Sequence, residues 1–262
     1  MPKMGSIKFA RPLLAVLLTV SALTSNAAAL TSAPLNSPNW PDLKKRFFDN
    51  QRVVFDSHVK VVAPLKAEDS MNVPVGVSVE GLRDVEEVLV IADLNPIVKV
   101  LQFYPYAAKP SLSFRLKLQQ GSPVRAFART RDGVWHGGGV WVDASGGGCT
   151  APSAGRATGS WSETLNMVQA RFWQRDNSNR LRVRIMHPMD TGLAPGIPVF
   201  HIEQINLSDE SGRKFMRVDT FEPVSENPVF SFDFRPDLPP RGAVLLSGAD
   251  NNGNKIQARV PQ

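Results

Sequence analysis

Short apolar runs that alternate with polar residues recur from about residue 73 to the end of the chain, with turn signals between them. Valine stands at every second position from Val73 to Val79, and Leu181, Val183 and Ile185 alternate with arginines. Alternation with period two is typical of a half-buried β-strand. Asp132-Gly133 and the Asn-Asn-Gly-Asn stretch at 251–254 are hairpin signals. The pattern predicts an all-β fold of sandwiches or barrels.

The predicted strands fall into two sets, one before and one after a stretch rich in Gly, Ser and Ala near residues 146–160. Two sets of this size predict two β-sandwich domains in tandem. We place the first domain at residues 30–152, a linker at 153–164 and the second domain at 165–262. One short N-terminal helix is expected at Trp40, because Pro41 suits its first turn and Leu43 and Phe47 are four residues apart.

The N-terminus has the pattern of a cleavable signal peptide over residues 1–29. Lys3, Lys8 and Arg11 flank an apolar run at 12–23 that is too short to span a bilayer, and small residues follow it. No second run reaches membrane-spanning length. The mature protein is therefore expected to be soluble and exported, without membrane insertion after cleavage.

Removal of residues 1–29 changes the charge balance. Lys plus Arg falls from 30 to 27 while Asp plus Glu stays at 24, so the net charge falls from +6 to +3. A mild positive charge favours acidic partners. Export argues against nucleic acid as one of them.

The chain has one cysteine, Cys149, directly after Gly146, Gly147 and Gly148. A lone cysteine in an exported protein indicates either a reactive thiol or an intermolecular bond, whereas an arbitrary lone cysteine is most often buried and inert. A glycine run supplies backbone freedom and little bulk. The stretch is therefore interpreted as a flexible arm that presents the thiol.

No pattern typical of an enzyme stands out. The four histidines lack the spacing of a metal site, and we find neither a Gly-x-Ser-x-Gly elbow nor a P-loop. We expect a protein that is not an enzyme and that needs no metal or cofactor beyond a sulfur adduct on Cys149. Arg180, Arg182 and Arg184 share one strand face, which is either a solvated face or a contact surface for a partner.

The stretch Met186 to Gly192 carries a more specific signal. His187-Pro188-Met189 and Thr191-Gly192, followed by Ser225, Asn227-Pro228 and Asn252-Gly253, resemble SoxZ, the smaller subunit of the SoxYZ sulfur-carrier complex of bacterial thiosulfate oxidation. The first half resembles SoxY through Ala67 to Val75, Ile91 to Pro96, Arg131 to Trp135 and the Gly-Gly-Gly-Cys stretch. The order of the two halves, SoxY-like first and SoxZ-like second, resembles that of the fused SoxYZ-like carriers associated with quinoprotein alcohol dehydrogenases.

This resemblance implies two immunoglobulin-like sandwiches, a periplasmic location and covalent attachment of sulfur intermediates to Cys149. It implies periplasmic redox or sulfur-handling enzymes as partners, among them a quinoprotein dehydrogenase, with His187 and Met189 as candidate partner contacts. The sequence departs from SoxY because Cys149 is internal and is followed by Thr150-Ala151-Pro152, not by glycines at a free end. The alternative is a non-catalytic accessory module of a quinoprotein dehydrogenase system.

Overall fold

The computed structural model describes Met1, residues 35–238 and residues 244–260, except 156–158, 160 and 176. The predicted signal peptide, apart from Met1, and part of the predicted linker lie outside the described residues. Within them, no helix is both long and apolar enough to cross a membrane.

In the part of the first half that the structure describes, the chain forms helix α1 and strands β1 to β8. Helix α1 (Trp40–Phe48) begins with Pro41 in its first turn, as the sequence predicts. The strands are β1 (Val53–Phe55), β2 (Val59–Val62), β3 (Val73–Val79), β4 (Val85–Ala92), β5 (Lys99–Tyr104), β6 (Ala108–Leu116), β7 (Ser122–Thr130) and β8 (Trp135–Val142). The Asp132-Gly133 signal is confirmed as the turn between β7 and β8.

The described residues of the second half add a four-residue helix, α3 (Trp161–Thr164), and seven strands. The strands are β9 (Val168–Arg175), β10 (Ser178–Ile185), β11 (Ile202–Asp209), β12 (Lys214–Thr220), β13 (Val229–Phe234), β14 (Val244–Asp250) and β15 (Lys255–Val260). The sequence from Trp161 to Gln174 reads as one strand, but Trp161 begins α3 and the strand starts only at Val168. The hairpin signal at 251–254 is confirmed between β14 and β15.

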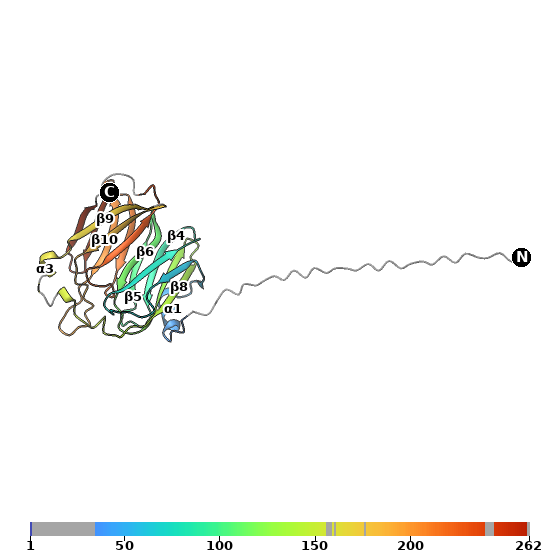
Figure 1. The fold of residues 1–262 in the computed structure, drawn as a ribbon, viewed down its shortest axis with the longest axis horizontal. Coiled ribbons are helices and arrows are strands. Elements are labelled where there is room, and N and C mark those ends of the chain that lie inside the picture. Colours follow the sequence, from blue (N-terminus) through green and yellow to red (C-terminus); the bar gives the residue numbers. More distant parts are fainter. Residues whose placement is uncertain (2–34, 156–158, 160, 176, 239–243, 261–262) are drawn as a thin grey trace.

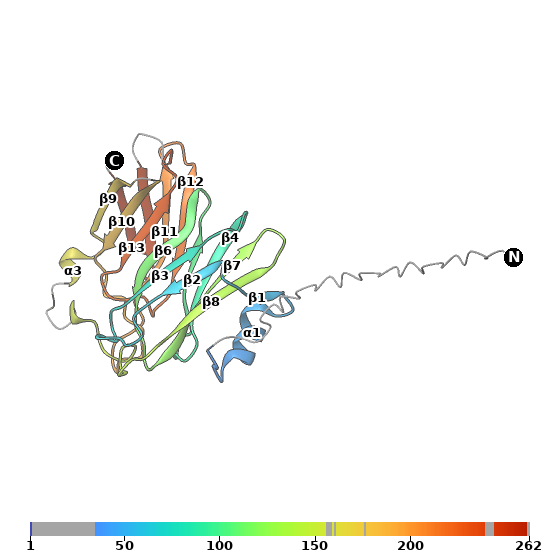
Figure 2. The same cartoon turned by 45° about the vertical axis from the view of Figure 1, so that its right-hand side comes forward.

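The strands form two stacked sheets, and both sheets run through both halves of the chain (Figures 1 and 2). The nine-stranded sheet has the order β1-β8-β7-β4-β5-β12-β11-β14-β15, and the six-stranded sheet has the order β2-β3-β6-β13-β10-β9. The halves join twice, where β5 pairs with β12 and where β6 pairs with β13, each time antiparallel. The all-β sandwich architecture is therefore confirmed, with the two halves joined edge to edge.

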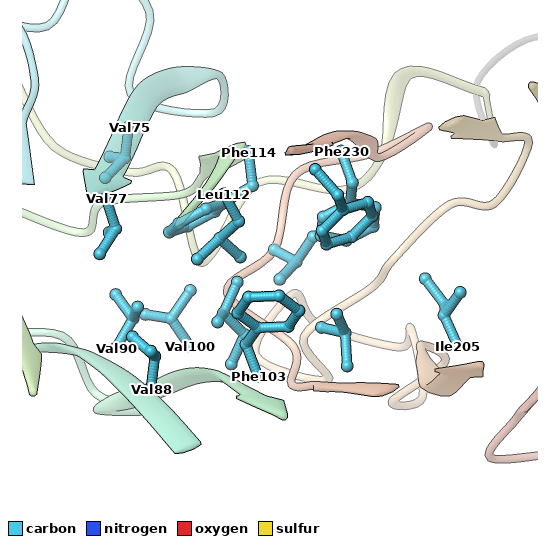
Figure 3. Packing of buried hydrophobic residues seen from close by; sticks show 14 of the residues in the cluster. Val75, Val77, Val88, Val90, Val100, Phe103, Leu112, Phe114, Ile205 and Phe230 are labelled. Atoms are coloured by element: carbon cyan, nitrogen blue, oxygen red, sulfur yellow. The ribbon is translucent and has the colours of Figure 1, made fainter. Parts of the chain in front are cut away.

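One apolar core fills the space between the sheets and includes residues of both halves. Figure 3 shows residues of both halves in this cluster, with Val100 and Phe103 from the first half and Ile205 and Phe230 from the second. The ring of Phe103 also lies 5.6 Å, between centroids, from that of Phe232. Because both halves bury apolar surface in the same cluster, each half stabilises the other.

A second, smaller cluster lies on the other side of the nine-stranded sheet. Helix α1 packs Leu43 and Phe48 there against Phe127 of β7 and Trp135 of β8. The sequence sets Val124 and Ala126 against Arg125 and Phe127 in β7, and this alternation is confirmed, but the face that carries Arg125 and Phe127 is covered as well and both side chains are fully buried. Arg125 pairs with buried Asp93 at 2.9 Å. A strand covered on both faces loses its polar face.

Candidate functional site

The segment that follows β8 folds into a compact turn. The carbonyl of Gly147 accepts the backbone N–H groups of Thr150, at 3.2 Å, and of Ala151, at 3.0 Å. The φ angles of Gly146 and Gly147 are +100° and +80°, in the region that glycine adopts at little cost. These two glycines allow the turn to form.

Gly148 serves close packing. A Cβ at this position would lie 2.2 Å from the carbonyl oxygen of Ser70 and 2.6 Å from that of Leu118. The N–H groups of Gly147 and Gly148 donate to the carbonyls of Gln119 and Leu118. The structure thus corrects the prediction of a flexible arm at residues 146–148, because these glycines hold the chain against the segment after β6.

Cys149 is completely buried, with 0% of its surface exposed. Its Sγ lies 3.7 Å from the carbonyl oxygen of Lys117, and its backbone N–H donates to Oε1 of Gln119 at 3.2 Å. Its carbonyl accepts a hydrogen bond from the hydroxyl of Thr191 in the second half. The prediction of an exposed, presented thiol is therefore corrected: the thiol lies inside the junction of the two halves.

Asn95 holds the segment on which Cys149 rests. Its side-chain amide donates to the carbonyl of Lys117 at 2.8 Å and accepts the N–H of Gln119 at 2.9 Å. Asn95 is itself buried. Because one buried amide satisfies both groups, residues 117–119 keep a fixed conformation beneath the thiol.

Lys117 is a buried cation beside the thiol, with only 1% of its surface exposed. In the sequence Leu116 and Leu118 alternate with Arg115 and Lys117, which predicts Lys117 on the outward face of a strand, but β6 ends at Leu116 and the alternation stops there. Its ammonium donates to the carbonyl of Met189. Burial lowers the pKa of Lys117, and the charge of Asp190 opposes this change.

Burial also raises the pKa of the Cys149 thiol to about 11, and the nearby charge of Lys117 counteracts this only in part. A thiol with this pKa is almost entirely protonated at neutral pH, and the thiolate is the nucleophilic form. Cys149 is therefore a poor nucleophile in the folded structure.

Further hydrogen bonds join the segment after Cys149 to the second half. The N–H of Ser153 donates to Asp190 at 3.2 Å, and those of Ala154 and Gly155 donate to the carboxylate of Glu226 at 2.7 and 2.8 Å. We call residues 146–155 the thiol segment. It is anchored on both sides of the junction.

His187 and Met189 lie beneath this junction, so the structure corrects their prediction as partner contacts: both are buried. His187 Nδ1 accepts the N–H of Met189 at 3.0 Å, and its Nε2 lies 3.6 Å from Asp250. Burial lowers the pKa of His187 to about 4, although the charge of Asp250 acts in the opposite direction. Met189 has a φ of +52°, and its sulfur accepts the N–H of Ile202 at 3.3 Å. These residues position the loop that holds the thiol segment.

The arginines of β10 lie apart from this site, on the outer face of the six-stranded sheet. Arg180 pairs with Asp233 at 2.7 Å. Arg182 and Arg184 are exposed. Their alternation with buried Leu181, Val183 and Ile185 is confirmed.

Segments that carry the resemblance in both halves meet around Cys149. Ser70 lies in the segment 67–75 and Asn95 in 91–96, while Asp190 and Thr191 come from the loop after β10. Ser225 donates to the carbonyl of Met71 at 2.7 Å, which joins a first-half segment to a second-half segment.

Lys117 and Gln119 were not identified as site residues from the sequence. The only signal at these positions is that the expected alternation of β6 runs into polar residues before a glycine. Among the described residues no group of three or more His, Cys, Asp or Glu side chains is arranged to hold a metal ion. The site is therefore a single thiol with a buried cation beside it.

Comparison with known families assigns each half of the chain to a protein family. The model of the family "Sulfur oxidation protein SoxY" matches residues 44–149, and that of "Sulphur oxidation protein SoxZ" matches residues 169–261. This chain belongs to the fused SoxYZ-like proteins. The SoxY match ends at Cys149, and together the two SoxYZ matches cover most of the chain.

Solved structures resemble parts of this SoxYZ-like chain. The sulfur carrier protein SoxY from Chlorobium limicola f thiosulfatophilum has 19% identity and a TM-score of 0.36, with 40% of this chain and 90% of that chain covered. A superoxide reductase (neelaredoxin) from Ignicoccus hospitalis has 19% identity and a TM-score of 0.30, with 33% and 80% covered. No curated protein matches the chain.

Proposed function

We propose that this SoxYZ-like protein is a periplasmic carrier that holds a sulfur intermediate covalently on Cys149 and delivers it to sulfur-handling enzymes. The observation that carries the proposal is the meeting of SoxY-like and SoxZ-like segments around the one cysteine of the chain. The end of the SoxY match at residue 149 also supports it. In this role the protein is not an enzyme and carries no resident metal or cofactor.

Loading requires the thiol segment to leave the junction, because a thiol with no exposed surface cannot meet a second protein's active site. At least five hydrogen bonds hold the segment: those of Gly147, Gly148 and Cys149 to residues 118–119, that of Thr191 to Cys149, and that of Ser153 to Asp190. At about 1 kcal/mol each, these five bonds alone make opening cost at least about 5 kcal/mol, which leaves at most on the order of one molecule in several thousand open. Binding of a partner enzyme that favours the open form supplies this free energy.

Once the segment is open, the thiol loses the desolvation that raises its pKa and approaches the ordinary value of about 8.5. The segment is attached to β8 on one side and to α3 on the other. It therefore enters a partner as a loop of two adjacent strands of backbone. An open cleft fits such a loop better than a single-file tunnel.

A second candidate function is a non-catalytic accessory module of a periplasmic quinoprotein dehydrogenase system. The complete burial of Cys149 and the pKa of about 11 favour this reading, because a thiol without a carrier role needs no access to solvent. In that case Cys149 serves only to pack the junction.

Replacement of the thiol in the native host separates the two functions. We expect Cys149→Ser to abolish complementation of a strain that lacks the gene, while the fold is retained because serine is nearly isosteric. Ser153→Ala, four residues away in the same segment, is the matched control and should complement fully. Complementation is scored as growth or turnover on the sulfur or alcohol substrate for which the deletion strain is defective. Full activity of Cys149→Ser would support the accessory role and contradict the carrier.

A further inference from the structure

The outer face of the six-stranded sheet presents arginines from three strands. Pairing sets Arg182 of β10 opposite Arg171 of β9 and Ser231 of β13, and it sets Arg184 opposite Gln169 and Val229. Directly paired residues point to the same face of a sheet. Arg115 of β6 is exposed on this face as well, beside Arg182 in one groove. We call Arg115, Arg171, Arg182 and Arg184 the arginine face.

These four arginines have no acidic partner within the part of the chain that the structure describes. Asp233 is the acidic residue of β13, the strand between β6 and β10, and Arg180 binds both of its carboxylate oxygens. Like charges that face each other across a strand pair destabilise a sheet, and Arg171 faces Arg182 directly. A negative surface brought to this face would remove that repulsion.

The shape and composition of the face suit a protein partner. Two open grooves of about 370 and 670 Å³ share Arg182 and Val229. Apolar groups lie between the charges, namely Pro74 and Pro64 in the first groove and Trp173 in the second. Arginine and tryptophan are enriched at protein interfaces. Six strands about 4.8 Å apart and four to nine residues long, about seven on average, give a face of roughly 24 by 23 Å, or about two thirds of one side of a standard interface.

The arginine face leads to the end of the sheet at which the thiol segment lies. Arg115 precedes buried Lys117 by two residues. Arg184 is the last residue but one of β10, whose following loop supplies Thr191 to Cys149. Figure 2 shows β6, β10 and β13 in one layer. A protein bound on this face is therefore next to the junction that holds the thiol.

We propose that the arginine face docks an acidic surface of a partner protein. Lipid headgroups and nucleic acid phosphates also carry negative charge, and the cross-linking test below separates them from a protein. The proposal stands on the charges, grooves and register of this sheet, and it does not depend on what Cys149 carries.

The test begins with a photoreactive amino acid at position 231, between the arginines, introduced into the full-length protein in its native host. The same residue at position 247 on β14 is the matched control, because both serines are half-buried strand residues. We expect position 231, and not 247, to cross-link to a specific protein. Cross-linking to lipid or nucleic acid, or equal products at both positions, would overturn the proposal.

The cross-linked protein is then purified, and its affinity is measured by calorimetry. We expect Arg171→Glu/Arg182→Glu to weaken binding at least tenfold and wild-type binding to weaken as salt is raised, because these charges carry the attraction. Arg52→Glu/Arg213→Glu changes the net charge equally at exposed positions outside this face and should bind within twofold of wild type. Equal loss in both double variants, or no loss in the first, would contradict a docking role for this face.

Discussion

Cys149 in the folded protein is expected to react with iodoacetamide at pH 8 at least about 100-fold more slowly than in the denatured chain. Two effects combine. The thiol has no exposed surface, and its pKa of about 11 leaves only about one thiolate in a thousand at pH 8. An unfolded thiol with a pKa of about 8.5 is about one quarter ionised at the same pH. The measurement is the rate of mass increase in native buffer and in denaturant.

Two variants test whether the junction itself protects the thiol. Gly148→Ala places a Cβ against the carbonyls of Ser70 and Leu118, so the thiol segment has to move away and labelling should accelerate at least tenfold. Thr191→Val removes the hydrogen bond to the Cys149 carbonyl and should accelerate labelling by a smaller factor. Gly76→Ala, in β3, where an added Cβ makes only ordinary contacts of 3.7 Å or more, is the control and should label at the wild-type rate. Wild-type labelling at the denatured rate would contradict the buried site.

The two halves of the chain, made separately as residues 35–155 and 161–260, are expected to be unstable alone and to form a stable complex when mixed. Each half alone exposes the edges where β5 meets β12 and β6 meets β13. It also exposes its part of the shared core, including Phe103 in one half and Phe232 in the other. Unpaired edges and apolar surface of this kind favour aggregation.

Circular dichroism during heating measures this dependence. The intact chain should unfold in a single transition, the mixture in a transition that rises with concentration, and each half at least 20 °C lower or without cooperativity. A half that melts cooperatively by itself at the temperature of the intact chain would show that the junction adds little stability.

The strands were largely predictable, because alternation reports directly which residues face the core. The alternation of β3 and β10 and the turns at Asp132-Gly133 and 251–254 are confirmed. The pairing between halves was not predictable, since β5 and β12 lie more than 100 residues apart and alternation does not identify a strand's neighbour. The burial of Arg125 depends on α1 covering the sheet, which is likewise a tertiary effect.

The site was predictable in its location and not in its environment. Cys149 and the family segments identified the junction of the halves. The glycines before it gave an ambiguous signal, since a missing Cβ permits either freedom or a close approach of two backbones. At Gly148 the close approach applies, because the carbonyls of Ser70 and Leu118 occupy the space of a side chain. Lys117 was missed because strand alternation was extended one residue beyond the end of β6.

The intact mass of the protein isolated from its native host, before and after treatment with a reductant, tests the carrier most directly. The carrier account predicts a fraction with added mass that the reductant removes, that maps to the peptide containing Cys149, and that is absent from Cys149→Ser. The buried junction further predicts that the adduct-bearing fraction shows greater exposure of residues 146–155 to limited proteolysis. An unmodified Cys149 in every preparation from actively metabolising cells would contradict the account.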